Sequence, residues 1–169
     1  TRDWSSDVCS SDLPLTMTSA QLIECMASAG CSPFGSLLVL DREYACPALD
    51  YLQEDFSEDF RGVLWDEGLM EWKTEVNDCD NFSLRAMDEA QKAHVRSHNR
   101  QGNKGLAFGC FFYYPEWAKG GAHCINFAII RHLDGSHGPV FFEPQPGTLF
   151  GLRNLTQKER ESCFGYVCC

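Results

Sequence analysis

The chain has 169 residues, of which 44% are hydrophobic and 12% aromatic, and its formal net charge is -10. These values are typical of a single globular domain and unlike those of a disordered chain. The negative charge disfavours binding to nucleic acid and to anionic membranes, and no apolar run approaches the ~18 residues of a transmembrane helix.

Residues 2–13, "RDWSSDVCSSDL", show no hydrophobic periodicity. They resemble the in-frame translation of a common sequencing-library adaptor, as an untrimmed metagenomic or transcriptomic assembly would leave it. We therefore interpret residues 1–13 as an artefact outside the fold. Met17 is then a plausible native start, and residues 14–169 form one domain. A genuine disordered tail is the alternative interpretation.

The first half of the chain favours helices. Residues 19–30 carry an apolar stripe at helical spacing, with Ser19 as a candidate N-cap and Gly30 at the end. Residues 36–41 are apolar enough for a strand or a buried turn of helix. Residues 46–68 place a proline in the first turn of an acidic amphipathic helix, or of two short ones, ended by Gly68. The apolar face would carry Leu49, Leu52, Phe56, Phe60 and Leu64.

The segment "DCDNFSLRAMDEAQKAHVR" (78–96) predicts a further amphipathic helix. Apolar side chains recur from Phe82 at intervals of three and four residues, and Asn77 or Asp78 can cap the helix. The polar segment 97–105 should follow it as a loop.

The second half favours strands. Residues 105–114, 121–130 and 138–145 are short, aromatic or β-branched, and bounded by Gly, Pro or Asp. Residues 148–152 and 161–169 can add further strands, with a polar turn or one helical turn at 156–160. Helices followed by strands predict an α+β fold in which N-terminal helices pack on an antiparallel sheet.

Nine cysteines lie outside the adaptor-like segment, without a CxxC pair or zinc-type spacing. Their odd number and the lack of a visible export signal indicate free thiols in a reducing, cytoplasmic compartment. A disulfide framework in a secreted protein is the alternative, if a signal peptide was lost where the adaptor joined.

Three residues at the ends of predicted elements suggest one site. Cys79 begins the helix at 79–96, where the helix dipole favours a thiolate. His123 begins a strand after "GGA", and Glu143 ends the following strand, so adjacent pairing would bring them together. This order fits a nucleophile, a base and a residue that orients the base. Taken singly, each residue also has an ordinary structural explanation, as a packing cysteine, a surface histidine and a solvated carboxylate.

The blocks "DCDNFS", "HCINFAI" and "FFEPQ", together with "DREYACP" (41–47), resemble a known family. They are similar to the papain-like cysteine protease domain at the C-terminus of the Marasmius oreades agglutinin and to related small phage and bacterial proteins. The resemblance spans roughly residues 36–150. It implies a papain-like fold but no sugar-binding β-trefoil, because only the protease-like part is matched.

The resemblance also implies roles for individual residues. Cys79 would be the nucleophile, His123 the general acid and base, and Glu143 the orienter of the imidazole. Gln145 would donate a hydrogen bond to the oxyanion, and Trp72 would lie near the catalytic cleft. Asp78 and Asp80 would be candidate Ca²⁺ ligands, although Asn81 stands where the family often has another Asp.

The resulting hypothesis is a cysteine hydrolase that cleaves an amide bond of a peptide or protein substrate through a thioester, with no cofactor required except possible Ca²⁺. The first alternative is a non-catalytic binding or virion-associated module on the same fold. The second is a metal site at Cys79 and His123 with Cys124 or Cys110, which alternation along a strand disfavours for the neighbours His123 and Cys124. Neither nucleic acid nor a membrane is expected as a partner.

Overall fold

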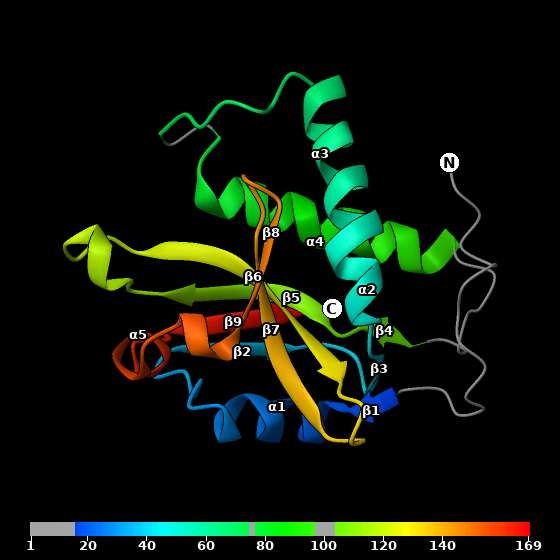
Figure 1. The fold of residues 1–169 in the computed structure, drawn as a ribbon. Helices are drawn as coiled ribbons and strands as arrows, with labels where there is room; N and C mark the ends of the chain where they lie inside the picture. The colour runs from blue at the N-terminus through cyan, green and yellow to red at the C-terminus, as the bar shows by residue number, and fades with distance from the viewer. Residues whose placement is uncertain (1–15, 75–76, 97–103) are drawn as a thin grey trace.

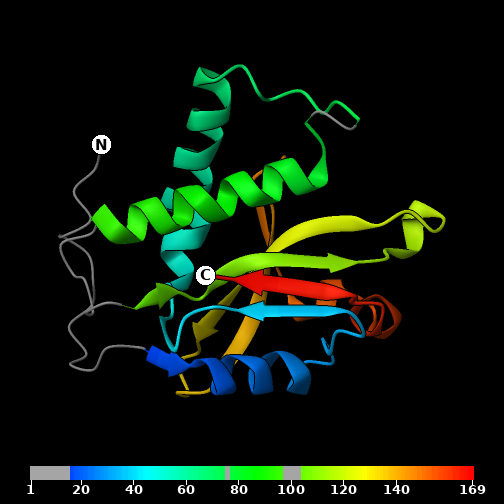
Figure 2. The same cartoon turned by 180° about the vertical axis from the view of Figure 1, so that it is seen from behind.

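The computed structural model describes residues 16–74, 77–96 and 104–169. The fold has three layers, with a central sheet, one helix below it and two long helices above it (Figure 1). The view from behind shows the same order, with the single helix under the sheet and the others over it (Figure 2). The α+β prediction is confirmed, but helices cover both faces of the sheet.

The central sheet has six strands in the order β2-β9-β5-β6-β7-β8. Its strands are β2 (Ser36–Val39), β5 (Phe108–Tyr113), β6 (His123–Arg131), β7 (His137–Glu143), β8 (Thr148–Gly151) and β9 (Gly165–Cys168). Four neighbouring pairs are antiparallel, as predicted, whereas β2 pairs with β9 in parallel. The expectation of a purely antiparallel sheet was therefore wrong, because the chain brings β9 back between β2 and β5.

A small second sheet joins β1 (Thr16–Thr18), β3 (Glu43–Ala45) and β4 (Gly105–Leu106). The sequence did not predict β1 or β3. Each is three residues long, too short for an alternating pattern to stand out. Their pairing is sustained by burial of Met17 and Tyr44, both at most 4% exposed.

The helix predicted at 46–68 begins after the proline and has three parts, α2 (Leu49–Tyr51), η1 (Leu52–Phe56) and α3 (Ser57–Asp66). Four of its predicted core residues are buried, namely Leu52, Phe56, Phe60 and Leu64. Leu49, predicted on the same face, is exposed. The predicted helix at 79–96 is α4 (Cys79–Arg96), and the loop predicted after it lies largely outside the described residues.

The lower helix is α1 (Ser19–Ser28), and its N-cap is Thr18, not the predicted Ser19. Thr18 and Gln21 form a capping box, which satisfies two backbone N–H groups at the helix start. The remaining short helices are η2 (Glu116–Ala118), η3 (Leu152–Asn154) and α5 (Gln157–Glu161), the last at the predicted polar turn.

Two hydrophobic cores lie on opposite faces of the sheet. The lower core joins α1 through Leu22 and Met26 to Phe111, Phe127 and Phe141. The upper core joins α3 and α4 to the other face, where Phe56 packs against Phe108 and Phe142 at ring-centroid distances of 5.2 and 5.4 Å. Burial on both faces explains why the interior of β6 is apolar except for the buried Asn126 and shows no polar alternation.

All nine cysteines of the described ranges are free, and six of them are buried. Burial raises the pKa of the Cys31 and Cys46 thiols to about 12, so both are neutral at physiological pH.

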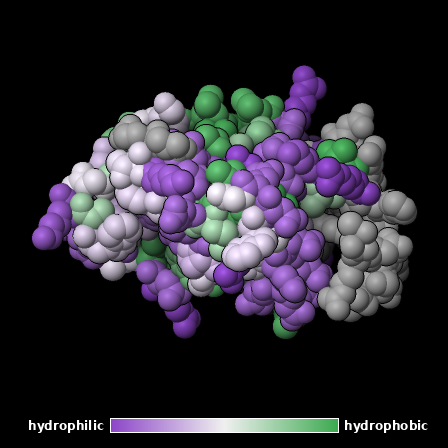
Figure 3. All heavy atoms as spheres, turned by 90° about the horizontal axis from the view of Figure 1, so that it is seen from above, coloured by the Kyte–Doolittle hydropathy of each residue, from purple (hydrophilic) through white to green (hydrophobic). Residues whose placement is uncertain are grey.

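No helix in the described part of the chain is long and apolar enough to cross a membrane. Seen from above, the helical side is mostly hydrophilic, with separate apolar patches (Figure 3).

Candidate functional site

The start of α4 positions Cys79. Asp78 precedes the helix and its carbonyl accepts the first helical hydrogen bond, from the Phe82 N–H at 3.0 Å. The Asn81 side chain accepts from the Asp78 N–H at 3.2 Å, which is one half of a capping box. Cys79 therefore occupies the first turn of an 18-residue helix, as predicted, and is only partly buried.

His123 and Glu143 meet at the ends of adjacent strands. His123 is the first residue of β6 and Glu143 the last of β7, and these strands are antiparallel neighbours. His123 Nε2 lies 2.8 Å from Glu143 Oε2, with the two side chains 13% and 28% exposed. The predicted pairing of these strand ends is thus present in the structure.

Cys79 completes the cluster, because it lies close enough to the His123 ring to influence the pKa of the imidazole. Burial of the ring acts to lower the pKa of His123, but the hydrogen bonds and charges of Cys79 and Glu143 together outweigh it. The net effect raises the pKa of His123 from 6.5 to about 9. The imidazole is therefore protonated at neutral pH and lies between a thiol and a carboxylate.

A buried polar network fixes α4 against β6 beneath this cluster. Ser83, one turn after Cys79, donates to the Cys124 carbonyl at 2.9 Å. The Asn126 amide donates to the Ser83 carbonyl at 2.8 Å and to the Gly109 carbonyl at 3.1 Å. Because Cys124 adjoins His123 in the chain, these bonds set the position of the thiol relative to the imidazole.

Trp117 is a site residue that the sequence reasoning missed. It lies in η2, between β5 and β6, and is 68% exposed. Its ring centroid is 5.3 Å from that of His123, with an interplanar angle of 72°. The available signal was a tryptophan in a Gly- and Pro-containing connection, "YYPEWAKGG", where an apolar core role is uncommon.

Two further residues were assigned to the site by the resemblance alone. Trp72 lies in the connection between α3 and α4 and is 50% exposed. Gln145 lies in the turn after β7 and is partly buried. Among the described residues, no hydrogen bond or ring contact joins either side chain to His123. Their roles in an oxyanion site and a cleft stay predictions.

Asp78 and Asp80 do lie together. A hydrogen bond with Asp78, partial burial and the charge of Asp78 raise the pKa of Asp80. Calcium takes six to eight oxygen ligands, so this pair alone falls short of a calcium site. Residues 16–74, 77–96 and 104–169 hold no group of three or more His, Cys, Asp or Glu side chains arranged for a metal. That finding also speaks against the alternative metal site at Cys79, His123 and Cys124 or Cys110.

The fold resembles two solved structures of known proteins. One is the complex of PSL1a with E64, at a TM-score of 0.64 and 19% identity, covering 90% of this chain and 51% of that chain. The other is the lectin of Polyporus squamosus bound to the human-type influenza-binding epitope Neu5Acα2-6Galβ1-4GlcNAc, at a TM-score of 0.61 and 20% identity, covering 90% and 49%. This chain therefore spans about half the length of either. No family model and no curated protein matches the sequence.

These comparisons correct the functional prediction. One of the two proteins that share the fold is a lectin, and this finding overturns the prediction that the chain is a cysteine protease. A peptide substrate is not supported either. The reasoning erred because a Cys, His and Glu set in a given order predicts proximity and not hydrolysis. The three side chains do come together, but the function must be argued from the surroundings of the cluster. Of the agglutinin resemblance, only the likeness of the fold to that of a lectin structure is supported.

Proposed function

We propose that this chain is a non-catalytic, carbohydrate-binding module whose ligand site is formed by Trp117, His123 and Glu143, with Cys79 at its edge. A papain-like arrangement of the fold remains part of the proposal, because a cysteine at a helix start meets a histidine at a strand start. The known lectin structures support the ligand class, and the site itself is argued from the residues below.

The observation that carries the proposal is the contact between Trp117 and the His123–Glu143 pair. Most of the indole is open to solvent, while its neighbour His123 is held by a carboxylate at 2.8 Å. Small-molecule sites combine apolar or aromatic surface with a few fixed polar groups. A sugar ring has a C–H face that can lie on an indole and hydroxyls that can meet an imidazolium and a carboxylate at its side.

The charge state of the pair suits hydroxylated ligands. With the pKa of His123 raised to about 9, the imidazolium donates hydrogen bonds at neutral pH, and Glu143 retains carboxylate lone pairs that accept them. A sugar hydroxyl both donates and accepts, so one hydroxyl can satisfy both partners. We therefore expect binding to weaken above about pH 9, where the imidazole loses its proton.

The test is calorimetric titration of the full chain with Galβ1-4GlcNAc and with Neu5Acα2-6Galβ1-4GlcNAc. We expect Trp117→Ala to weaken binding at least tenfold, which corresponds to about 1.4 kcal/mol. Trp72→Ala is the matched control, since Trp72 is also exposed but has no ring contact with His123 in the described structure. Equal loss in both variants, or no heat with either glycan, would overturn the proposal.

A further inference from the structure

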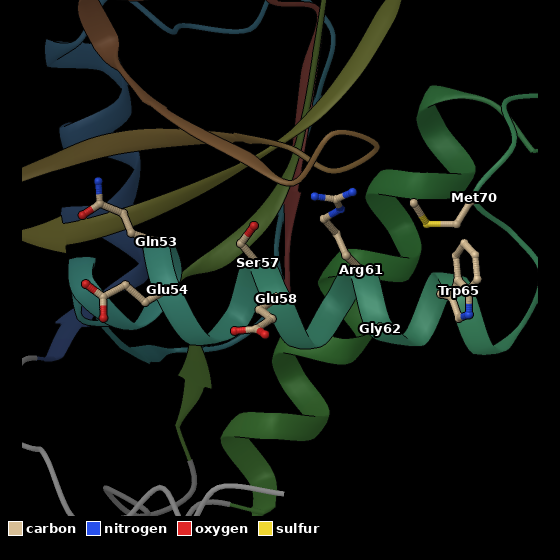
Figure 4. A pocket seen from close by; sticks show the side chains of 8 residues that line it. All are labelled: Gln53, Glu54, Ser57, Glu58, Arg61, Gly62, Trp65 and Met70. Atoms are coloured by element: carbon tan, nitrogen blue, oxygen red, sulfur yellow. The ribbon is translucent and has the colours of Figure 1, made fainter.

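A groove runs along the outer side of α3, on a different part of the surface from the His123 cluster. The groove is open to solvent and has a volume of about 440 Å³. Figure 4 shows Gln53, Ser57 and Arg61 projecting from successive turns on one side of the helix. The groove ends at Trp65, whose indole lies beside Met70 (Figure 4). Its volume falls within the roughly 300–1,000 Å³ that is usual for small-molecule sites.

The turn between β7 and β8 binds Ser57 and lies close to Arg61. Ser57 Oγ donates to the Gly147 carbonyl. A Cβ atom at Gly147 would lie 2.7 Å from Arg61 Cδ and 2.8 Å from Ser57 Oγ, so the absence of a side chain there gives these groups their space. Gly147 also has a φ of +68°, which favours glycine. One wall of the groove is thus polar, with Ser57 anchored to the turn.

The lining offers hydrogen-bond donors and acceptors in near balance. Arg61 supplies a guanidinium, and no ion pair occupies it among the residues that the structure describes. Glu54 and Glu58 supply carboxylates on the adjacent ridge of the helix. Gln53 can donate and accept. Such a set suits a neutral ligand with many hydroxyls better than one with a net charge.

The end of the groove is apolar and open. Trp65 is 75% exposed, so its indole does not contribute to core packing. Together with the neighbouring Met70 it forms an apolar surface that a ligand can reach. Between the two ends, Gly62 leaves a gap, since a Cβ placed there would meet nothing within 4 Å. A flat ring could therefore lie over Gly62 with its C–H face on Trp65 and its hydroxyls toward Arg61.

We propose that the α3 groove, lined by Gln53, Glu58, Arg61, Gly62, Trp65 and Met70, is a second carbohydrate-binding site that takes a neutral sugar. The inference rests on the proposed function for its ligand class, but the site is separate. An anionic ligand is disfavoured because Glu54 and Glu58 flank the groove and the chain carries a net charge of -10.

The test follows the tryptophan indole N–H signals by NMR while Galβ1-4GlcNAc is added to the full chain. Trp65→Phe and Trp117→Phe assign the two signals that report on the two sites. We expect the Trp65 signal to shift with saturation, and Arg61→Ala to weaken that curve at least fivefold while leaving the Trp117 curve unchanged. Arg153→Ala is the matched control, since Arg153 is also exposed but lies in η3.

The outcomes separate the two proposals. If Trp117 shifts and Trp65 does not, the second site is refuted and the first stands. If Trp65 shifts and Trp117 does not, the second site is supported and the proposed function at the His123 cluster fails. Gly62→Leu tests the groove independently, because its side chain would occupy the gap and should abolish the Trp65 shift in a chain that remains folded. Full retention of the shift would overturn the inference, as would the absence of any shift at either indole.

Discussion

Asn126 donates a 2.8 Å hydrogen bond to the carbonyl of Ser83, which joins the middle of the sheet to the first turns of α4. Both residues are fully buried. The same amide also donates to the Gly109 carbonyl at 3.1 Å. A buried carbonyl that loses its donor costs about 1–3 kcal/mol, so this one side chain stabilises the junction of three elements.

Asn126→Ala should therefore lower the free energy of unfolding by about 2–4 kcal/mol, because two buried carbonyls lose a donor and a small cavity remains. Urea denaturation measures the change. Asn154→Ala is the control, since Asn154 is exposed and should stay within about 0.5 kcal/mol of the parent. A similar small change for Asn126→Ala would show that water replaces the lost amide.

The His123–Glu143 pair predicts a pH-dependent stability. The folded-state pKa of His123 is about 9, above its unfolded value of 6.5, so the folded state binds the proton more tightly. This contribution is fully present below about pH 6.5 and is lost as the pH rises toward 9. For a partly exposed group we expect a loss on the order of 2 kcal/mol.

The measurement compares the parent with His123→Gln in urea at pH 6, 7.5 and 8.5. The difference in unfolding free energy between the two proteins should shrink as the pH rises. A comparison is needed because buried thiols also destabilise the folded state at alkaline pH. Glu143→Gln should lower the pKa of His123, which the imidazole proton signals report directly. A pH-independent difference between parent and His123→Gln would contradict the assignment.

Substitution by alanine should change the free energy of unfolding in opposite directions at two glycines. Gly109 lies inside β5, where a Cβ atom would meet the Val167 carbonyl oxygen at 2.1 Å and Phe127 Cε1 at 2.7 Å. Gly62 lies in α3, where a Cβ would meet nothing within 4 Å. We expect Gly109→Ala to destabilise by about 1–3 kcal/mol or more and Gly62→Ala to stabilise by about 0.5–1 kcal/mol. Thermal unfolding of both variants checks the signs.

Phe56 is the centre of the aromatic contacts in the upper core. It is 2% exposed and packs against Phe60, Phe108 and Phe142. Phe56→Ala should cost about 3–5 kcal/mol, measured by urea denaturation. Phe34→Ala is the matched control, since Phe34 is 70% exposed and should change stability by less than about 1 kcal/mol. Comparable losses in both variants would indicate that Phe34 is covered in solution.

The sequence predicted the elements whose signal is long or repeated. Phe82, Ala86 and Ala90 recur at helical spacing and are buried in α4, and the interior of β6 is apolar apart from Asn126. The meeting of Cys79, His123 and Glu143 was also predictable, since adjacent strands place their joined ends together and a helix start was visible from its cap.

Other features depend on tertiary context that no local pattern carries. The strand β3 is stabilised by hydrogen bonds to a neighbour on each side, β1 and β4, which come from distant parts of the chain. The edge-on contact of Trp117 with His123 requires the β5–β6 connection to fold back over the start of β6. The functional prediction failed for a related reason, because residue identity at three positions says little about what the surrounding surface accepts.

The parallel pairing of β2 with β9 has a consequence for synthesis on the ribosome. β2 leaves the ribosome early with Leu37 and Leu38, whose neighbours Tyr166 and Val167 belong to β9 and are made much later. β9 also pairs with β5, so the six-stranded order cannot close until β9 is available. Contacts between such distant segments form slowly and leave intermediates with exposed apolar strands. During that interval the nascent chain presents an unpaired apolar segment at β2, and a chaperone that binds extended apolar peptides would find it there.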